Sequence, residues 1–470
     1  MLLNNVRSQC KQILERKKHL YSFLGFIYHI MDQNDLAFKC FDKAIKIDPK
    51  YKEAYFYYGV AYNTLGSYDH AIKFYYKALK IDPNYKEVIY NLGISLYNSK
   101  QYAESASKFH QVINLDPTHK ESLFYLGKSY LSRNLYNEAI DYFNSAINLY
   151  PAYQSAYLQL GICLDKLKKY NEALEVFYKV NVIGNKDKFA FLNLGLTLRK
   201  LKQRDVAINC LKKAIELDPK FKEAYFNLGK LYSDIDDLER AYANFNKAIN
   251  LDQNNKEYYF NAGYTLSQLG RNEEAILKLN YAVKLDPNFK NALYFLSLSL
   301  IELKKILQAS THLETCIKLD SNFKEAYCNY GFTLNLLKRN EEACLNLKKA
   351  INLDSNYQLA YFYYGCALRS NNQKKEAIKA FQKAIDLDSE DNVSIYNLGL
   401  TYFEEKEFEI AENLFKKAMG IDNTYKDPYI GLGNLLMETK REKEAKQSFK
   451  KALQIDPTDY GLMEFINNIK

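Results

Sequence analysis

Histidine and cysteine are the residue types in this sequence best suited to catalysis or metal binding. The six histidines and eight cysteines include no Cys-x-x-Cys pair, no His-Glu-x-x-His motif and no acid or nucleophile recurring beside a histidine. No glycine-rich loop that could hold a phosphate precedes an expected helix. These spacings argue against an enzyme, a zinc site and a disulfide framework, and they predict neither a cofactor nor a bound metal.

Asparagine recurs at a spacing that suits peptide binding. Six asparagines are separated by multiples of 34 residues: Asn91, Asn193, Asn227, Asn261, Asn329 and Asn397. A side-chain amide donates and accepts hydrogen bonds, so it can pair with a peptide unit of any sequence. An aromatic residue precedes four of the six, including Phe226 and Phe260, and Lys230 lies three residues after Asn227. We expect a peptide-binding ladder in which Phe226 and Phe260 add apolar contacts and Lys230 attracts an acidic residue.

The prolines reveal the elements that would position this ladder. Seven of the eight are separated by multiples of 34 residues, and only Pro428 falls outside the series. Such a register is typical of a repeat protein. Counted from Lys18 as position 1, thirteen units follow without a gap: 18–51, 52–85, 86–119, 120–153, 154–187, 188–221, 222–255, 256–289, 290–323, 324–357, 358–391, 392–425 and 426–459.

Each unit is predicted to form two amphipathic helices. Position 8 is Gly in twelve units and position 20 is Ala in twelve, with Ser297 and Ser105 as the exceptions. Large apolar residues at positions 4, 7 and 11 share one helical stripe with the glycine, and positions 20, 24 and 27 share another. A Gly that faces an Ala across the pair lets the two helix axes approach closely.

The turns between units are expected at positions 31 and 32. Asp occupies position 31 in eleven units, and Pro at position 32 cannot continue the preceding helix. The fifth unit lacks this Asp-Pro pair, so the turn before Lys188 should be altered. Units nine to twelve also lack Pro at position 32, and we expect the side chains that replace it to cap the next helix: Ser321, Ser355, Ser389 and Asn423.

Both ends of the sequence are predicted to be capping helices. Residues 1–17 carry apolar side chains at helical spacing, namely Val6, Cys10, Ile13 and Leu14. Residues 460–470 do the same with Leu462, Met463, Phe465, Ile466 and Ile469. Each segment could cover an otherwise bare terminal repeat.

The 34-residue pattern resembles the tetratricopeptide repeat. Unit 222–255 carries that family's signature residues, Tyr225, Leu228, Gly229, Tyr232, Ala241, Phe245 and Ala248, and departs from it only at Gln253, where Pro is usual. The resemblance implies an all-α fold, an α-solenoid in which thirteen contiguous helix pairs form a right-handed superhelix and the first helices line the concave face. RNA-binding pentatricopeptide repeats, with a period of 35 residues, fit less well.

The resemblance also implies the type of function. The array is similar to that of the O-linked N-acetylglucosaminyltransferases, but eleven residues after the last unit leave no room in this sequence for a transferase domain. We expect a non-catalytic protein-interaction scaffold that holds an extended peptide in the concave groove and belongs to a multiprotein complex. The main alternative is that the ladder only packs neighbouring repeats, and that the chain is a structural part of a cytoskeletal or ciliary assembly through its convex face and ends.

Charge disfavours two other classes of partner. The net charge is +9, and Lys at position 1 is usually followed by an acid at position 2, which argues against RNA or DNA binding. Positions 5 and 6 are never basic, unlike those of the chaperone-binding members of the family. No stretch of about 18 apolar residues occurs, and Leu2 and Leu3 are followed at once by polar residues, so we expect no membrane contact and a soluble, cytoplasmic protein.

Overall fold

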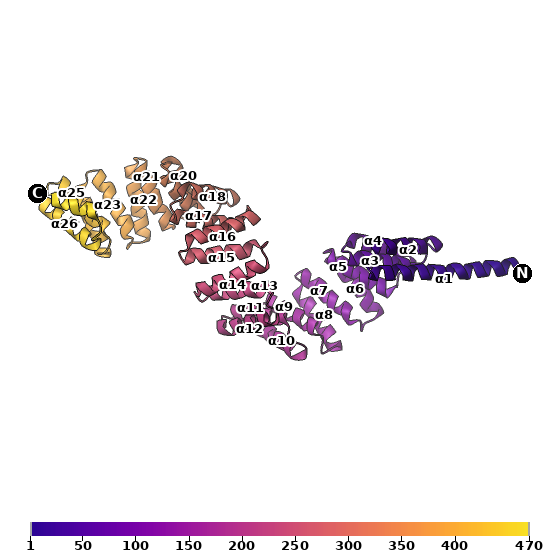
Figure 1. The fold of residues 1–470 in the computed structure, drawn as a ribbon. Coiled ribbons are helices and arrows are strands. Elements are labelled where there is room, and N and C mark those ends of the chain that lie inside the picture. The colour runs from indigo at the N-terminus through magenta and orange to yellow at the C-terminus, as the bar shows by residue number, and fades with distance from the viewer. Residues whose placement is uncertain (1, 469–470) are drawn as a thin grey trace. The chain divides into compact units, whose positions relative to one another are not determined.

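The computed structural model describes the backbone of residues 2–468 and the side chains of residue 9 and residues 11–466, and in this part of the chain all regular structure is helical (Figure 1). Each repeat contains a first helix, here the A helix, and a second, the B helix. The A helices are α1 (Leu2–Ile30), α3 (Lys52–Thr64), α5 (Lys86–Asn98), α7 (Lys120–Ser132), α9 (Gln154–Lys166), α11 (Lys188–Lys200), α13 (Lys222–Ser233), α15 (Lys256–Gln268), α17 (Lys290–Glu302), α19 (Lys324–Leu336), α21 (Gln358–Ser370), α23 (Asn392–Glu404) and α25 (Asp427–Glu438). The B helices are α2 (Asn34–Ile47), α4 (Tyr68–Ile81), α6 (Tyr102–Leu115), α8 (Tyr136–Leu149), α10 (Tyr170–Ile183), α12 (Arg204–Leu217), α14 (Leu238–Leu251), α16 (Asn272–Leu285), α18 (Ile306–Leu319), α20 (Asn340–Leu353), α22 (Lys374–Leu387), α24 (Phe408–Ile421) and α26 (Glu442–Ile455), and α27 (Tyr460–Asn468) follows.

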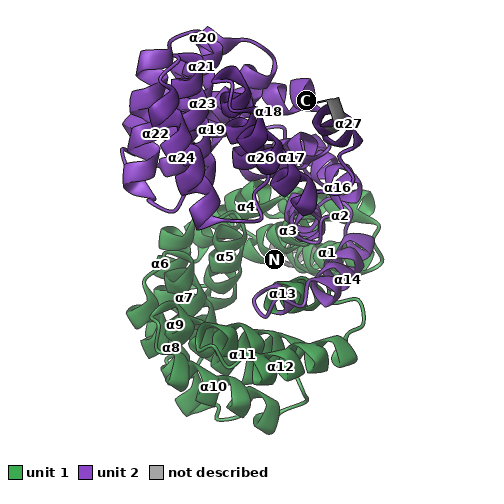
Figure 2. Ribbon diagram, turned by 90° about the vertical axis from the view of Figure 1, so that its left-hand side faces the viewer, with its two compact units in different colours: residues 1–231 green, residues 232–470 purple. Residues whose placement is uncertain are grey.

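The chain divides into two compact units, Met1–Leu231 and Tyr232–Lys470 (Figure 2). Within each unit, a B helix packs against its own A helix and against the A helix of the next repeat, as α16 does against α15 and α17. Successive A helices also touch one another, as α19 and α21 do. This packing is that of an α-solenoid, so the predicted fold class is confirmed.

The glycine at position 8 marks the closest approach of the two helices in a repeat. A Cβ added to Gly365 would lie 2.7 Å from the ring of Phe381, which occupies position 24 of the facing B helix. A Cβ on Gly263 would lie 2.7 Å from Leu279 and 3.2 Å from the carbonyl oxygen of Ala275. The predicted close crossing is confirmed. The space opposite the glycine is filled mainly by the side chain at position 24, and the backbone of the residue at position 20 lies beside it.

An aspartate builds the turn that follows most of the B helices. The carboxylate of Asp116 accepts a hydrogen bond from the backbone N–H of Thr118 at 3.1 Å and from the Nζ of Lys86 at 3.0 Å. Lys86 is at position 1 of the same repeat, and the Lys–Asp pair recurs between positions 1 and 31. The pairs are Lys18–Asp48, Lys52–Asp82, Lys86–Asp116, Lys188–Asp218, Lys256–Asp286, Lys290–Asp320, Lys324–Asp354 and Lys426–Asp456.

The expected capping role of Ser321, Ser355, Ser389 and Asn423 is wrong. The N-cap residues of the following helices are Phe323, Tyr357, Asp391 and Lys426, two or three positions further along the chain. The reason is that the aspartate turn does not need Pro, so the residue at position 32 simply lies inside it.

The turn of the fifth repeat is altered, as predicted. Gly184 stands at position 31, so this repeat has no carboxylate for a lysine to bind. Gln154 replaces the usual Lys at position 1, and its Nε2 donates to the carbonyl oxygens of Val180 at 3.0 Å and Asn185 at 2.7 Å. A neutral amide thus holds the turn where the ion pair is missing.

The N-terminal segment differs from the prediction. Residues 2–17 are not a separate capping helix, because α1 runs unbroken from Leu2 to Ile30 and no Gly or Pro separates its two halves. Ile13 and Leu14 are 53% and 49% exposed, so they do not cover the first repeat. The side chains of Val6 and Cys10 lie outside the described residues.

At the other end, α27 packs on the last repeat. Ile466 is buried in a cluster with Phe449 and Leu462, and the ring of Phe465 lies 5.3 Å from that of Phe449. Ile469 lies outside the described residues. The apolar face of α26 is therefore covered by the helix that follows it.

Because of the close crossing, changing Gly to Ala should have opposite effects on stability at two helical glycines, one at the crossing and one away from it. Gly365→Ala should lower the free energy of unfolding by about 1–3 kcal/mol, because its Cβ meets the Phe381 ring. Gly420→Ala in α24 should raise it by up to about 1 kcal/mol, because nothing lies within 4 Å of that Cβ and Ala favours the helix. Chemical denaturation of both variants measures the difference. Equal effects would contradict the assignment of position 8.

The aspartate turn predicts a specific pH dependence. Hydrogen bonds from the Thr118 side chain and Lys86 lower the pKa of Asp116 to about 2 from 3.8, so the carboxylate stabilises the fold above about pH 4 and loses this effect as the pH falls toward 2. Asp116→Asn keeps an oxygen for the turn but removes the charge, whereas Asp116→Ala removes both.

Urea midpoints at pH 7 should therefore rank wild type first, Asp116→Asn second and Asp116→Ala last. The gap between wild type and Asp116→Asn should close between pH 4 and pH 2. A gap that stays constant over that range would refute an ionic contribution from this carboxylate.

Candidate functional site

The position-6 side chains lie where successive A helices touch. The ring of Tyr363 stacks on that of Phe332 of the preceding A helix, with 4.6 Å between centroids, and the Nδ2 of Asn329 donates to the hydroxyl of Tyr294 at 3.1 Å. The face that the A helices form within one unit is called the A face below. Asparagine occupies position 6 of this face in six repeats and is half-buried in each.

Each of the six asparagines first bonds its own helix. The Nδ2 of Asn193 donates to the carbonyl oxygen of Phe189, four residues earlier, at 2.8 Å, and Asn227 and Asn261 make the same bond at 2.8 Å. Asn91, Asn329 and Asn397 do so at 2.7, 3.0 and 2.8 Å. One N–H of each amide is therefore not available to a ligand.

The amide oxygens remain open to a ligand. No residue that the structure describes donates a hydrogen bond to the Oδ1 of any of these asparagines, so each can accept one from a peptide N–H. Asn193 and Asn227 come from successive A helices of the first unit, and Asn261 belongs to the second. That the three hold one peptide together stays a prediction.

The aromatic residues at position 5 have internal packing partners. The ring of Phe260 lies 5.1 Å from Phe289 and 6.0 Å from Phe295. Tyr90 is placed in the same way, 5.9 Å from Phe109 and 5.0 Å from His119. These rings fill the space between the A helix, the B helix and the next turn, so only their outer edges can reach a ligand.

The two remaining ladder residues lie together in α13. The Nζ of Lys230 lies 4.2 Å from the ring centroid of Phe226, which is a cation–π contact. The ligand roles of Phe226, Phe260 and Lys230 stay predictions.

Lys128 of α7 is a candidate binding residue that the sequence analysis did not select. Its Nζ lies 4.7 Å from the ring centroid of Tyr97, 5.0 Å from Tyr125 and 5.7 Å from Phe124, and burial lowers its pKa. No carboxylate of a described residue lies within ion-pair distance. A partly desolvated cation surrounded by rings is suited to bind an acidic group. The sequence signal is a Lys at position 9, which is apolar in most repeats, as at Ile94.

Most of the described cysteines are buried, whereas none of the histidines is and His19 and His70 are exposed. Burial raises the pKa of the Cys163, Cys316 and Cys328 thiols to about 12, so they stay protonated at neutral pH. Among the described residues, no three His, Cys, Asp or Glu side chains gather closely enough to hold a metal ion. Nor does any helix of this part of the chain combine the length and apolar character that crossing a membrane requires.

Comparison with solved structures finds several similar chains. The structure described as "YrrB: a TPR protein with an unusual peptide-binding site" is 23% identical, with 39% of this chain and 95% of that chain covered and a TM-score of 0.35. The APC/C hetero-tetramer Cut9-Hcn1 is 15% identical, with 97% and 96% covered and a TM-score of 0.47. MamA from Desulfovibrio magneticus RS-1 is 25% identical, with 36% and 96% covered and a TM-score of 0.34.

Family models identify the repeats directly. A model described as anaphase-promoting complex, cyclosome, subunit 3, matches residues 105–180. A comparison with curated proteins finds no match to the sequence. Tetratricopeptide repeat models match residues 19–51, 53–85, 87–119, 195–236, 222–255, 244–277, 324–357, 358–391 and 402–463. Since these matches together cover more than half of the chain, and six of them coincide with the 34-residue units, the chain belongs to the tetratricopeptide repeat family.

Proposed function

We propose that the chain is a non-catalytic scaffold that binds an extended segment of a partner protein along its A face, as a subunit of a multiprotein complex. The observation that carries this proposal is the recurring position-6 amide whose oxygen accepts no bond from a described residue. Backbone N–H groups of an extended segment are the donors that such a row can bind without regard to sequence. The match of residues 105–180 to a model of a complex subunit supports the assembly role.

The spacing of the A helices fits an extended ligand. Helices that pack directly lie about 8–10 Å apart, and an extended peptide rises about 3.3 Å per residue, so successive A helices meet about every third residue. In the first unit, α5 with Asn91 contacts α7 with Lys128. When a peptide N–H of the bound segment donates to Asn91, an acidic residue about three positions further along that segment would therefore lie near Lys128.

Removing two neighbouring amides should weaken binding without unfolding the protein. Hydrogen bonds contribute about 0.5–1.5 kcal/mol each, so Asn193→Ala with Asn227→Ala should cost about 1–3 kcal/mol of binding free energy. Partners are first identified by affinity purification and mass spectrometry, and the purified partner is then titrated against both forms. Thermal melts should coincide, because Ala also favours the helix.

The chain offers a matched control for this pair. Asn244 and Asn346 make the same bond to the carbonyl oxygen four residues earlier, at 2.8 and 2.9 Å, but lie on the B helices α14 and α20. Changing both to Ala should leave partner binding intact. If the A-face pair binds as tightly as wild type, the contact lies on the B helices or the ends, as in the structural alternative.

The half-buried Lys128 gives an independent test. Lys128→Met keeps the apolar stem among the rings and removes the charge, so binding of an acidic segment should weaken at least tenfold. Stability at pH 7 should not fall, because the desolvated charge is itself unfavourable. Lys383→Met, an exposed position on α22, is the control. Unchanged affinity in Lys128→Met would exclude this residue from the site.

A further inference from the structure

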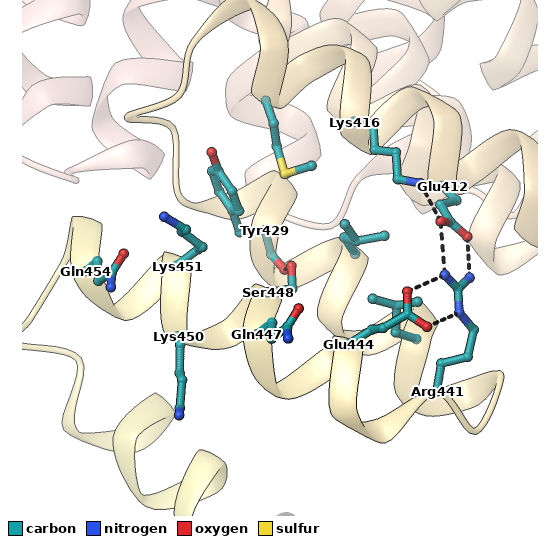
Figure 3. Close-up of a pocket in the computed structure, with 13 residues that line it drawn as sticks. Glu412, Lys416, Tyr429, Arg441, Glu444, Gln447, Ser448, Lys450, Lys451 and Gln454 are labelled. Atoms are coloured by element: carbon teal, nitrogen blue, oxygen red, sulfur yellow. Dashed lines mark hydrogen bonds and ion pairs between the residues drawn. The ribbon is translucent and has the colours of Figure 1, made fainter.

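A second candidate binding surface lies on the B helices of the last two repeats. Helices α24 and α26 both pack on α25 and leave a cavity of about 480 Å³ between them (Figure 3). Met419, Leu432 and Leu436 give it an apolar lining, and Tyr429 borders it. A cavity of this size has room for one or two large side chains.

The equivalent space is occupied by the protein's own side chains in three other repeats. At position 23, the ring of Phe74 lies 4.3 Å from Tyr58, and the ring of Tyr142 lies 5.4 Å from Tyr130. Lys278 at this position reaches the preceding B helix, where its Nζ donates to the Oδ1 of Asn246 at 3.0 Å. A large side chain at position 23 therefore occupies this space in these three repeats.

Ser448 occupies position 23 in the last repeat and is too short to close the groove. Its hydroxyl donates to the carbonyl oxygen of Tyr429 at 2.8 Å, so the side chain is held against the A helix. Ala380, at position 23 of the eleventh repeat, is equally small. In that repeat the large Tyr364 at position 7 packs in the same cluster, whereas position 7 of the last repeat is the smaller Leu432. The cavity thus follows from two comparatively small residues at one crossing.

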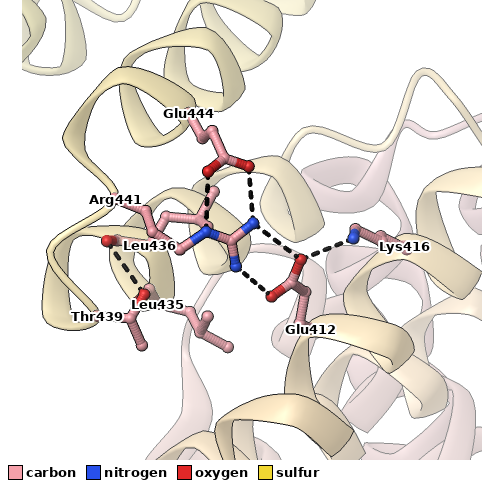
Figure 4. A network of polar contacts seen from close by, with 7 residues as sticks. All are labelled: Glu412, Lys416, Leu435, Leu436, Thr439, Arg441 and Glu444. Atoms are coloured by element: carbon pink, nitrogen blue, oxygen red, sulfur yellow. Dashed lines mark hydrogen bonds and ion pairs between the residues drawn. The ribbon is translucent and has the colours of Figure 1, made fainter.

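One wall of the cavity is a network of ion pairs (Figure 4). The Nη1 of Arg441 contacts Glu412 at 2.7 Å, its Nη2 contacts Glu444 at 2.7 Å, and Lys416 contacts Glu412 at 2.6 Å. These pairs lower the pKa of both carboxyls, with Lys416 the first cause at Glu412 and Arg441 the first at Glu444. Two cations and two carboxylates neutralise each other, so this wall adds shape and no net charge.

The opposite edge of the cavity is positively charged. Lys450 and Lys451 line it on α26, and both are exposed. No carboxylate of a residue that the structure describes lies within ion-pair distance of either lysine. An apolar lining beside two available cations is complementary to an apolar side chain with an acid close to it.

We propose that this groove binds a segment of a partner protein in which a Leu, Met or aromatic side chain is next to Asp or Glu. The apolar side chain takes the place that Phe74 or Tyr142 fills in other repeats, and the acid meets Lys450 or Lys451. This surface is separate from the A face, so one chain can bind two segments at once.

The test uses a display library of random 12-residue peptides selected on the full chain. Enriched peptides should combine a large apolar residue with an adjacent acid. They should bind the Ser448→Phe variant at least tenfold more weakly than wild type, because the new phenylalanine would fill the cavity as Phe74 fills the equivalent space in the second repeat. Lys450→Glu with Lys451→Glu should have the same effect without altering the packing. Lys348→Glu with Lys349→Glu, the same positions three repeats earlier, is the control and should bind normally.

Three results would overturn the proposal. They are a selection in which no enriched peptide contains an acidic residue, one in which none binds Ser448→Phe more weakly than wild type, and one in which none loses binding after the Lys450 and Lys451 changes. Thermal melts verify that Ser448→Phe is folded, and the lysine pair decides the question if it is not. Peptides selected for this groove should still bind after Asn193→Ala with Asn227→Ala.

Discussion

The close crossing of two helices at position 8 is the constraint on which every repeat depends. The ring or leucine at position 24 occupies the volume that a Cβ would need, and glycine stands opposite it in twelve of the thirteen units. At the exception, Ser297 is buried, and its hydroxyl is satisfied by donating to the carbonyl oxygen of Leu293 at 2.7 Å. Ser105, at position 20, likewise donates to the carbonyl oxygen of Gly93 at 2.8 Å. The crossing fixes which side of the A helix is buried, and thereby leaves position 6 at the contact between A helices.

The turn between repeats obeys a second, electrostatic constraint that tolerates substitution. Where Tyr150 replaces the aspartate, the Nζ of Lys120 lies 3.9 Å from the centroid of the tyrosine ring. Where Gly184 replaces the aspartate, Gln154 donates a hydrogen bond to the backbone of the turn instead. Each replacement keeps a link between position 1 and the turn. The link is exposed and therefore weak by itself, but it recurs along the chain and orients each new A helix.

The helix pairs could be predicted from the sequence because glycine, alanine and aspartate recur where only a few residue types fit. The turn between repeats was harder to predict. Pro at position 32 stands out in the sequence but is not required, because the hydrogen bonds of the aspartate at position 31 hold the turn. Residues 1–17 were predicted as a cap because their apolar residues have helical spacing, and spacing alone does not show whether there is a surface for them to cover. Lys128 and Ser448 were overlooked for a related reason. Their significance depends on what neighbouring repeats place in the same space, which requires coordinates rather than periodicity.

Site-specific photo-crosslinking tests most directly whether partners lie on the A face. A photoreactive phenylalanine derivative can replace Tyr57, Tyr125 or Tyr363, which occupy position 6, or Tyr76, Tyr178 or Tyr281, which are exposed on B helices. The substitution is conservative at all six sites, so the fold should be preserved. Crosslinks to a purified partner from one or more position-6 sites, with none from the three B-helix sites, are the predicted result. Crosslinks from the B-helix sites alone would contradict a function carried by the A face.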